Sequence, residues 1–443
     1  MDGTYFDRGL ETRPWADVSA AAFAKAQRQF QRAYDVSPFY RRKYREAGVD
    51  PALVHSPADF AKLPFVTKDE ERRSQEEDPP YGGHLCVPAE EIVRVHASSG
   101  TTGRPTFFAL TAADVATWRT IMARTFYTAG IRRDDTAACL ANLAMFVGGI
   151  PVIEAYSAIG AAAVPIGATA GTERTIELMR DLGVTVIAIT PSFAAYLGEL
   201  VERHLGFPAA ELGLRRLLVG GEPGGQIPAV REQIRSVWGC PVRDAMGMGE
   251  FAGAMWAESD DEAGMHFCAQ DEVYLELIDP DSGALLPFED GAEGELIYTA
   301  VERQAHPLIR FRSHDHVRVQ MAATPSGRTA PRVTTLGRTD DMLLVRGINV
   351  FPSAVRDVVA RFVPETTGFI QIVLPRPGPL VQPPLAVEVE VAGTVPAERR
   401  DDLCHRLAAS LRERLSFTAD VRPVAEGALP RTALKTQYVR IDP

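Results

Sequence analysis

The sequence has few cysteines, and none has a spacing typical of a disulfide framework or a zinc module. The five cysteines of the 443-residue chain are scattered, and no two form a C-x-x-C pair. An odd number of unpaired thiols is typical of proteins that fold in a reducing compartment. The only metal-like pair is His266 with Cys268, and no further zinc ligands accompany it in the sequence. The pattern therefore argues against a secreted disulfide protein and against a structural zinc site.

Long apolar runs are also missing, and so is a surplus of positive charge. No apolar stretch approaches the roughly 18 residues that a membrane-spanning helix needs. The start of the chain, residues 1–8, is polar and acidic and lacks a signal-peptide pattern. The net charge of -11 argues against a surface that coats nucleic acid. We therefore expect a cytoplasmic protein with no nucleic-acid partner and no membrane association.

The remaining composition is that of a globular protein, with 46% hydrophobic and 24% charged residues. The length exceeds what one hydrophobic core usually supports, so we expect more than one domain. Between residues 91 and 238, apolar strand-like runs alternate with helical patterns, which predicts βαβ units and a parallel sheet. The expected strands are 91–97, 184–190 and 214–219, and the expected helices are 114–128, 173–182, 192–205 and 227–238. The charge run at 68–77 is expected to be a solvated loop.

The pattern changes after about residue 270, where antiparallel strands are expected. These are residues 273–278, 296–301 and 317–320, with a DPDSG turn at 279–283. A final α+β unit is expected from helices at 353–362 and 397–415 and strands at 369–374, 385–391 and near Val421. The sequence thus predicts an α/β protein with a large domain over 1–337, including a β-rich subdomain, and a small mobile α+β domain over 338–443.

The sharpest local motif is a loop rich in serine, threonine and glycine at residues 98–106, with the sequence SSGTTGRPT. Glycines allow the backbone to wrap around a ligand and present its N–H groups, and the hydroxyls can donate to phosphate oxygens. The segment is not a Walker A loop, because no G-x-x-x-x-G-K-[ST] pattern can be written there. A phosphate-binding loop is the favoured interpretation, and a plain surface loop is the alternative.

Further motifs extend the interpretation over nearly the whole chain. They are GGEP at 220–223, MGMGE at 246–250, RFRSHD at 310–315, GRTDDM at 337–342, RGINVFP at 346–352 and LPRT at 429–432 followed by Lys435. The N-terminal region adds the phrases SPFYRRKYREAGVD and LPFVTKDE. With the SSGTTG loop, these segments resemble the ANL superfamily of adenylate-forming enzymes, and most closely the phenylacetate-CoA ligase family.

The resemblance implies that ATP activates a carboxylic acid as an acyl-adenylate, with Mg²⁺ as cofactor and CoA as the expected acceptor. Such chemistry depends on positioning and on neutralising phosphate charge. Lys435 is the implied catalytic residue, a mobile point charge between carboxylate and α-phosphate. Glu250 is the implied Mg²⁺ ligand, and Asp340 the implied hinge of the small domain. The implied nucleotide-binding residues are Ser98, Ser99, Gly100, Thr101, Thr102, Gly103, Gly221, Glu222, Asp244, Ala245, Met246, Gly247, Asp315 and Arg338.

Two of these assignments also have a chemical reason of their own. The Asp315 carboxylate can accept two hydroxyl hydrogen bonds, which suits a ribose diol, and Arg338 offers a rigid fork of donors for ribose or phosphate. The neighbouring His314 and His316 are expected to have structural or solvent-facing roles. The acyl pocket implied by the resemblance contains Ala141, Phe146, Gly148, Gly220 and Met248.

The sequence departs from the family pattern mainly where the acyl and adenine pockets are expected. Met246 replaces the usual tyrosine, Gly249 a hydroxyl residue, Leu434 a glycine and Gly224 a common tryptophan. The segment at 141–149 keeps only Phe146 and the glycine pair of a tyrosine-rich stretch. Loss of large aromatic side chains should widen or reshape the acyl pocket. We therefore expect a substituted aryl or arylacrylic acid rather than phenylacetate itself.

Two alternatives remain open from the sequence. The activated acyl group could pass to an acceptor other than CoA, such as a carrier-protein thiol, an amine or a small inorganic nucleophile. The chain could instead be a degenerate nucleotide-binding or regulatory protein, although it keeps Glu250, Asp315, Arg338 and Lys435. The resemblance also implies a possible homodimer.

Overall fold

The computed structural model describes residues 1, 3–98, 105–346, 348–376, 378, 380–430 and 437–442. The chain forms two compact units. The first unit comprises Met1–Ala188, Arg243–His314 and Arg318–Thr334, and the second comprises Ile189–Val242, Asp315–Val317 and Thr335–Pro443. The predicted domain boundary near residues 337–341 lies within the second unit and stays a prediction.

Several helices of the first unit begin at a side-chain cap that the sequence provides. Thr111 caps the longest predicted one, α6, and forms a capping box with Asp114, so the helix begins just before its predicted start. Gly183 follows α8 with a positive φ, as expected after a helix end. The helices are α1 (Arg8–Glu11), α2 (Trp15–Val36), α3 (Pro38–Glu46), α4 (Pro57–Phe60), α5 (Lys68–Glu77), α6 (Ala112–Thr128), α7 (Ile150–Ile159) and α8 (Thr172–Asp181).

The charge run at 68–77 is a helix, so the predicted solvated loop is wrong. Thr67 and Glu70 form a capping box that starts α5. Glu71, Ser74 and Gln75 are buried on one face of α5, although the helix contains no apolar residue. The T-x-x-E spacing at 67–70 was the available signal, and the absence of an apolar stripe concealed it.

A parallel sheet in the first unit confirms the predicted βαβ arrangement. Strand β3 (Thr136–Cys139) pairs in parallel with both β4 (Ala162–Pro165) and β5 (Val186–Ile189). Helix α7 connects β3 to β4, and α8 connects β4 to β5. Each crossover therefore returns the chain to the end of the sheet at which the preceding strand began, as parallel strands require, and β4 and β5 lie on opposite sides of β3.

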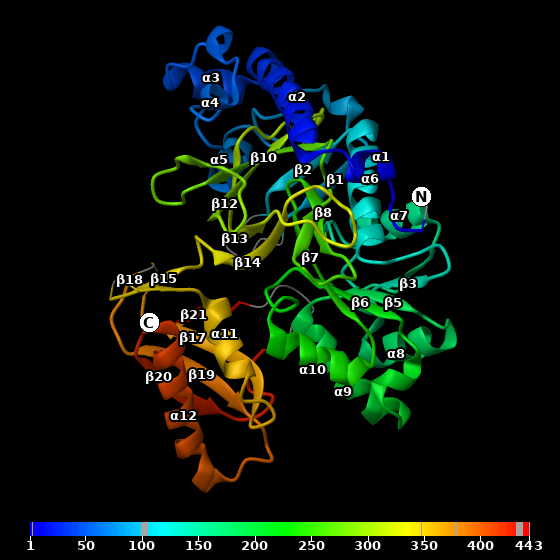
Figure 1. The fold of residues 1–443 in the computed structure, drawn as a ribbon, viewed down its shortest axis with the longest axis vertical. Helices are drawn as coiled ribbons and strands as arrows, with labels where there is room; N and C mark the ends of the chain where they lie inside the picture. Colours follow the sequence, from blue (N-terminus) through cyan, green and yellow to red (C-terminus); the bar gives the residue numbers. More distant parts are fainter. Residues whose placement is uncertain are drawn as a thin grey trace. The chain divides into compact units, whose positions relative to one another are not determined.

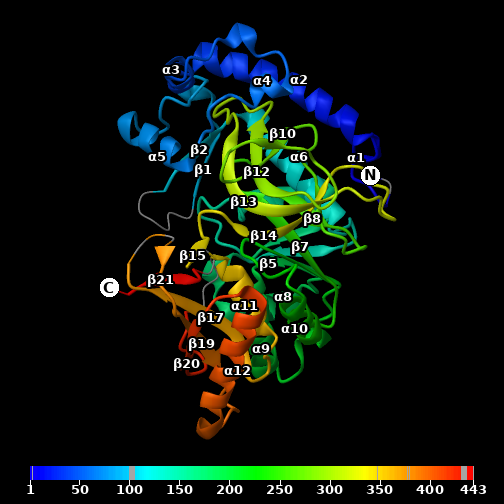
Figure 2. The same ribbon diagram turned by 60° about the vertical axis from the view of Figure 1, so that its left-hand side comes forward.

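The rest of the first unit is mainly antiparallel, as predicted after residue 270. Its hydrogen-bonded order is β11-β10-β12-β13-β14-β9-β8-β7, and α2 packs against β10 and β12 (Figure 2). Strand β10 matches its prediction, whereas β13 starts six residues earlier than expected and includes the histidine pair. The strands are β7 (Val242–Met248), β8 (Ala252–Glu258), β9 (Met265–Phe267), β10 (Val273–Ile278), β11 (Leu285–Leu286), β12 (Glu293–Ala300), β13 (Phe311–Gln320) and β14 (Arg332–Arg338), and a separate hairpin joins β1 (Arg94–Ala97) to β2 (Phe107–Leu110).

The second unit contains a helical part and a small α+β part. The helical part contains the helices α9 (Pro191–Leu205) and α10 (Pro228–Trp238), with strand β6 (Arg216–Gly220) between them in the sequence. In the α+β part, helices α11 (Pro352–Ala360) and α12 (Ala397–Leu415) pack against a four-stranded sheet (Figure 1). That sheet has the order β20-β19-β17-β21, and a three-stranded sheet has the order β16-β15-β18. These strands are β15 (Leu343–Val345), β16 (Ile348–Val350), β17 (Thr366–Leu374), β18 (Leu380–Val381), β19 (Leu385–Val391), β20 (Ala419–Val424) and β21 (Val439–Ile441).

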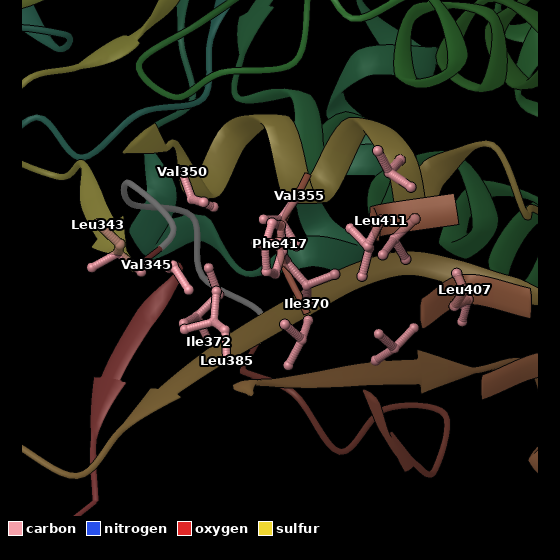
Figure 3. Close-up of a cluster of buried hydrophobic side chains, with 14 of the residues drawn as sticks. Leu343, Val345, Val350, Val355, Ile370, Ile372, Leu385, Leu407, Leu411 and Phe417 are labelled. Atoms are coloured by element: carbon pink, nitrogen blue, oxygen red, sulfur yellow. The ribbon is translucent and has the colours of Figure 1, made fainter. Parts of the chain in front are cut away.

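The α+β part has a hydrophobic core built from its own residues (Figure 3). Leu403, Leu407 and Leu411 repeat every four residues along α12 and are fully buried. Val387 and Val389 alternate along β19 and fill the facing layer. This region, which begins after residue 342, therefore buries apolar surface without help from the rest of the chain.

The cysteines and the His266–Cys268 pair have the following surroundings in the structure. All five cysteines are free, and four of them are buried. His266 bonds to the Ser259 hydroxyl through Nε2 at 3.0 Å, and Cys268 Sγ contacts the carbonyl of His266. Among the residues that the structure describes, no group of three potential protein ligands could hold a metal ion. No helix in the described part of the chain is long and apolar enough to cross a bilayer.

Candidate active site

The base of the SSGTTG loop is closed by a pair of residues that flank it. The backbone N–H of Ser98 donates to the carbonyl of Thr106, and the N–H of Thr106 donates to Ser98 Oγ, both at 3.0 Å. Ser98 thus holds the loop ends together through its hydroxyl oxygen. Ser99, Gly100, Thr101, Thr102 and Gly103 lie outside the described residues.

Glu250 lies in a buried group of charges in the first unit. Its carboxylate is 2.8 Å from Lys68 Nζ, and the side chain is 6% exposed. The buried Arg303 donates to the backbone carbonyl of Glu250 and lies over the Trp118 ring. Burial, followed by the charge of Glu250, raises the pKa of Glu71 to about 8, so this carboxyl group is protonated at neutral pH. The Glu250 carboxylate already holds a cation, the Lys68 ammonium.

The segment at 141–149 is fixed against β1 and β8. The Met145 carbonyl accepts from the N–H of Ala97 at 3.0 Å and lies 3.0 Å from His96 Nδ1. Gly148 supports the Phe146 ring so closely that a Cβ there would lie 2.5 Å from it. Of the predicted acyl-pocket residues, Phe146 and Gly148 are therefore in contact, and Ala141 belongs to the same segment.

The MGMGE motif occupies the end of β7 and the turn that follows it. A Cβ on Gly247 would collide with the backbone of Gly253 on β8, where the pairing of the two strands shifts register. Asp244, at the other end of the motif region, is buried and donates its N–H to Glu258. Ala245 and Met246 pair with β8, and Met248 is buried. The glycine at 247 is required by the close approach of two strands.

The GGEP segment follows β6 in the second unit. Gly220 ends the strand, and Gly221 has a φ of 84°, a conformation that favours glycine. The carboxylate of the buried Glu222 accepts the backbone N–H of Ser192 at 2.8 Å, within the first turn of α9. Glu222 therefore stabilises a helix N-terminus and fixes the segment that precedes Pro223.

Asp315 and Arg338 are brought together in the second unit, as expected for residues of one site. Arg338 donates through Nη1 to Asp315 at 3.1 Å and through Nε and Nη2 to Asp340 at 2.9 and 2.8 Å. Burial lowers the pKa of Arg338, but Asp315 and Asp340 outweigh this effect and raise it. The predicted hinge residue Asp340 thus contacts Arg338 of the predicted ribose-binding pair directly.

Lys435 lies outside the described residues, but the chain on both sides of it is held by buried polar side chains. The buried Glu390 on β19 accepts the N–H of Leu429 at 3.1 Å. Gln371 on β17 donates to the carbonyl of Gln437 at 3.1 Å. Strands β19 and β17 therefore hold the chain at Leu429 and at Gln437.

Some residues of these sites were missed from the sequence. Lys68 and Arg303 bond to Glu250, and Arg356 donates to the carbonyl of Pro223. Lys68 lies in the LPFVTKDE phrase, which was a usable signal, whereas Arg303 and Arg356 have no local pattern that distinguishes them. His314 and His316 take no part in a described metal group; His316 packs beside Phe351 at 5.8 Å between ring centroids.

Comparison with known proteins assigns the chain to a family. The family model described as AMP-binding enzyme matches residues 42–300, and the model of the AMP-binding enzyme C-terminal domain matches residues 347–442. The chain belongs to the AMP-binding enzyme family. This assignment confirms the resemblance that the sequence motifs predicted, and it accounts for both the large α/β region and the small C-terminal one.

Within the AMP-binding enzymes, the chain is similar to phenylacetate-coenzyme A ligase of Escherichia coli (strain K12). The two are 32% identical over 425 residues, which cover 96% of this chain and 94% of the relative. A crystal structure of 2-hydroxyisobutyryl-CoA ligase in the postadenylation state matches with a TM-score of 0.91 at 31% identity, covering 100% of this chain and 93% of that one. The same ligase with 2-HIB-AMP and CoA in the thioesterification state matches with a TM-score of 0.73 at 32% identity and the same coverage. The predicted α/β fold of an adenylate-forming enzyme is confirmed.

Proposed function

We propose that the protein activates a carboxylic acid with ATP to form an acyl-adenylate and then transfers the acyl group to CoA as a thioester. The observation that carries the proposal is the chain-wide match to CoA ligases, together with the Asp315–Arg338–Asp340 cluster. In this reaction the carboxylate attacks the α-phosphorus, pyrophosphate leaves, and the CoA thiolate then displaces AMP. Acceptors other than CoA are the alternative.

In this proposal the nucleotide is held mainly by the second unit. Asp315 accepts the ribose hydroxyls, while Arg338 orients that carboxylate and offers its remaining donors to ribose or phosphate oxygens. Gly221 and Glu222 belong to the adenine-binding segment, with Asp244, Ala245, Met246 and Gly247 as the corresponding residues of β7. Lys435 neutralises the carboxylate and α-phosphate as they approach, and its region turns about Asp340 before the CoA step.

Mg²⁺ fits the charge pattern around Glu250. A buried carboxylate that already holds an ammonium group accommodates a cation, and among the described residues no group of three potential protein ligands is formed around it. Mg²⁺ usually takes one or two protein carboxylates and completes its coordination with phosphate oxygens and water. When bound, the ion would neutralise charge on the phosphates of ATP. Glu250 would hold it, and Arg303 would hold the backbone of Glu250.

Replacement of Glu250 by glutamine should raise the Mg²⁺ requirement of adenylation. We expect E250Q to need about tenfold more Mg²⁺ for half-maximal ATP–pyrophosphate exchange, because an amide oxygen is a weaker ligand than a carboxylate. The measurement is exchange as a function of Mg²⁺ at saturating ATP. The exposed Glu232 on α10 provides the matched control E232Q. An unchanged Mg²⁺ dependence in folded E250Q would remove Glu250 from the metal site.

We assign a substituted aryl or arylacrylic acid as the substrate class. The wall near Glu250 is apolar: a Cβ on Gly249 would lie 3.5 Å from Val147 and 3.6 Å from Phe108. These are ordinary contacts, so packing does not require glycine at 249 and a larger residue would fit. Phe146 supplies an aromatic ring in the same region. The missing hydroxyl and tyrosine side chains favour an acid that is larger and less polar than phenylacetate.

Acid-dependent ATP–pyrophosphate exchange tests both parts of the proposal. The panel contains phenylacetate, ring-substituted phenylacetates, cinnamates and 2-hydroxyisobutyrate, and the best acid is then incubated with CoA. We expect exchange with a substituted aryl or arylacrylic acid and formation of its CoA thioester. A preference for 2-hydroxyisobutyrate or unsubstituted phenylacetate would overturn the substrate class. Exchange without thioester would overturn CoA as acceptor, and no exchange with any acid would overturn adenylation of this range of acids.

The domain boundary, location and assembly complete the proposal. The separate core of the C-terminal region supports a mobile domain over 338–443, moving relative to a large domain over 1–337. Five free cysteines support a reducing, cytoplasmic location. A homodimer that binds neither nucleic acid nor membranes is the assembly we propose, and the negative net charge supports the absence of a nucleic-acid partner.

A further inference from the structure

Arg356 is a buried arginine on α11 whose contacts no family motif explains. Its Nη1 atom donates to the carbonyl of Pro223 and to the hydroxyl of Tyr438, each at 2.6 Å. The side chain is buried, and its partner Pro223 lies 133 residues earlier in the chain. We call Arg356, Tyr438 and Pro223 the Arg356 cluster. A buried guanidinium with two short hydrogen bonds is a geometrically specific connection.

The cluster joins three segments to which the proposed reaction gives separate tasks. Pro223 follows the Gly221–Glu222 pair proposed for the adenine. Tyr438 lies three positions after Lys435 and begins the return to β21. Arg356 belongs to α11, which follows the proposed hinge at Asp340. The hydrogen bonds therefore link the nucleotide segment to the strand that follows the catalytic lysine.

The protonation state of the cluster suits this link. Burial is the largest effect on Tyr438 and raises its pKa, and the nearby Glu222 raises it further, to about 12 despite the positive Arg356. The hydroxyl therefore keeps its proton across the physiological range. It accepts from Arg356 and lies 3.5 Å from the Pro223 carbonyl, to which it can donate.

Gly224 is required for this arrangement. A Cβ at position 224 would lie 2.6 Å from Pro191 Cβ and 3.3 Å from Arg356 Nη1. The first distance is shorter than packed atoms tolerate, and the second would crowd the guanidinium. The absence of a side chain at 224, where the resembled family commonly has tryptophan, leaves room for Arg356 beside the Pro223 carbonyl.

We propose that Arg356 is a positioning residue for the adenylation half-reaction, because it fastens the C-terminal region to the nucleotide segment while Lys435 acts. The inference rests on the proposed function. Pro223 lies before Asp340 in the chain, and Arg356 and Tyr438 lie after it. A rotation about Asp340 would therefore separate Arg356 from Pro223 while leaving Arg356 and Tyr438 together. The Pro223 bond belongs to the adenylation state and must break before CoA reacts.

The test separates the two half-reactions. Adenylation is measured by ATP–pyrophosphate exchange with the best acid of the panel, and thioester formation by adding CoA to the chemically synthesised acyl-adenylate of that acid. We expect R356A to lower exchange about 10- to 100-fold, the effect of losing one charge-assisted hydrogen bond. Thioester formation should be unchanged or faster. R356K, which keeps the charge but not the fork, should fall between R356A and wild type.

One more variant and a control guard against a simple folding defect. Y438F removes only the hydroxyl group and should lower exchange in the same direction as R356A, with a smaller effect. R361A is the matched control, since Arg361 follows the same helix, is exposed and pairs with Asp357. Equal loss in both half-reactions, or no loss in either by folded R356A, would overturn the proposed role.

Hydrogen exchange provides a readout that needs no substrate. In the ligand-free protein, amides at 224–227 and 352–360 should exchange faster in R356A than in R361A, because the connection between the segments is lost. Equal exchange rates would overturn the Arg356 cluster itself. If the wild-type protein activates no acid but hydrogen exchange changes as expected, the proposed function fails while the cluster stands.

Discussion

Replacement of Lys435 by alanine is expected to lower ATP–pyrophosphate exchange about 100- to 1000-fold. Removal of a group that stabilises charge developing in a transition state commonly costs this much. Lys435 is assigned to the approach of two anions, the carboxylate and the α-phosphate, where a positive charge has its greatest effect. Formation of thioester from a supplied acyl-adenylate should persist, because that step forms no new bond to the phosphate.

The matched control for K435A is K62A. Lys62 is an exposed lysine with a side chain 75% accessible to solvent, and it pairs only locally with Asp59. We expect K62A to retain wild-type exchange. If K435A kept more than about a tenth of wild-type exchange, this residue would not supply the charge that adenylation requires.

Replacement of Asp315 by asparagine is expected to raise the KM for ATP about 10- to 100-fold, with a smaller change in kcat. The ribose remains bound throughout the reaction, so loss of its acceptor weakens the ground state and the transition state alike. The amide also leaves Arg338 with one fewer carboxylate partner. Hydrogen bonds that involve a charged group contribute about 1.5–3 kcal/mol, which corresponds to this range. The measurement is initial-rate exchange over a range of ATP concentrations.

A nucleotide without ribose hydroxyls makes the Asp315 test specific. Wild-type enzyme should use 2′,3′-dideoxy-ATP much less efficiently than ATP. In D315N the exchange rates with the two nucleotides should differ little, because the carboxylate that accepts from the ribose hydroxyls is already missing. E293Q serves as control, since Glu293 makes an exposed ion pair with Arg318 on the same strand as Asp315. Independent, additive losses from D315N and the dideoxy nucleotide would place the ribose elsewhere.

Elements with a strong local pattern were predictable from the sequence. The continuous apolar run at β5 predicts a buried strand, and the apolar residues spaced four apart in α12 predict a helix. Both elements form as predicted. Strand β7 was missed because Gly247 and two methionines interrupt a β pattern, and only the contact with β8 explains them. Helix α5 was missed because a helix that buries polar side chains has no apolar stripe.

In the candidate sites too, residues within motifs could be predicted from the sequence, and their partners outside the motifs could not. Motifs identified Asp315 and Arg338, and the structure brings their charged groups to 3.1 Å. The partners that orient motif residues could not be predicted, because they come from distant parts of the chain with no shared pattern. Two examples are Arg303, which donates to the backbone carbonyl of Glu250, and Glu390, which accepts from the N–H of Leu429. A buried hydrogen bond of this kind follows from the completed fold and leaves no periodic trace in the sequence.

The close packing around Gly224 makes the order of substitutions matter. A larger residue introduced at 224 meets Pro191 at once and crowds Arg356, so it is expected to be tolerated only after Arg356 has been shortened and Pro191 has moved. The two positions are therefore epistatic: a change that is harmless in one background is harmful in the other. A transplant of the tryptophan common at this position in relatives would have to change position 356 first. The same two substitutions are therefore expected to be tolerated in one order and to be destabilising in the other.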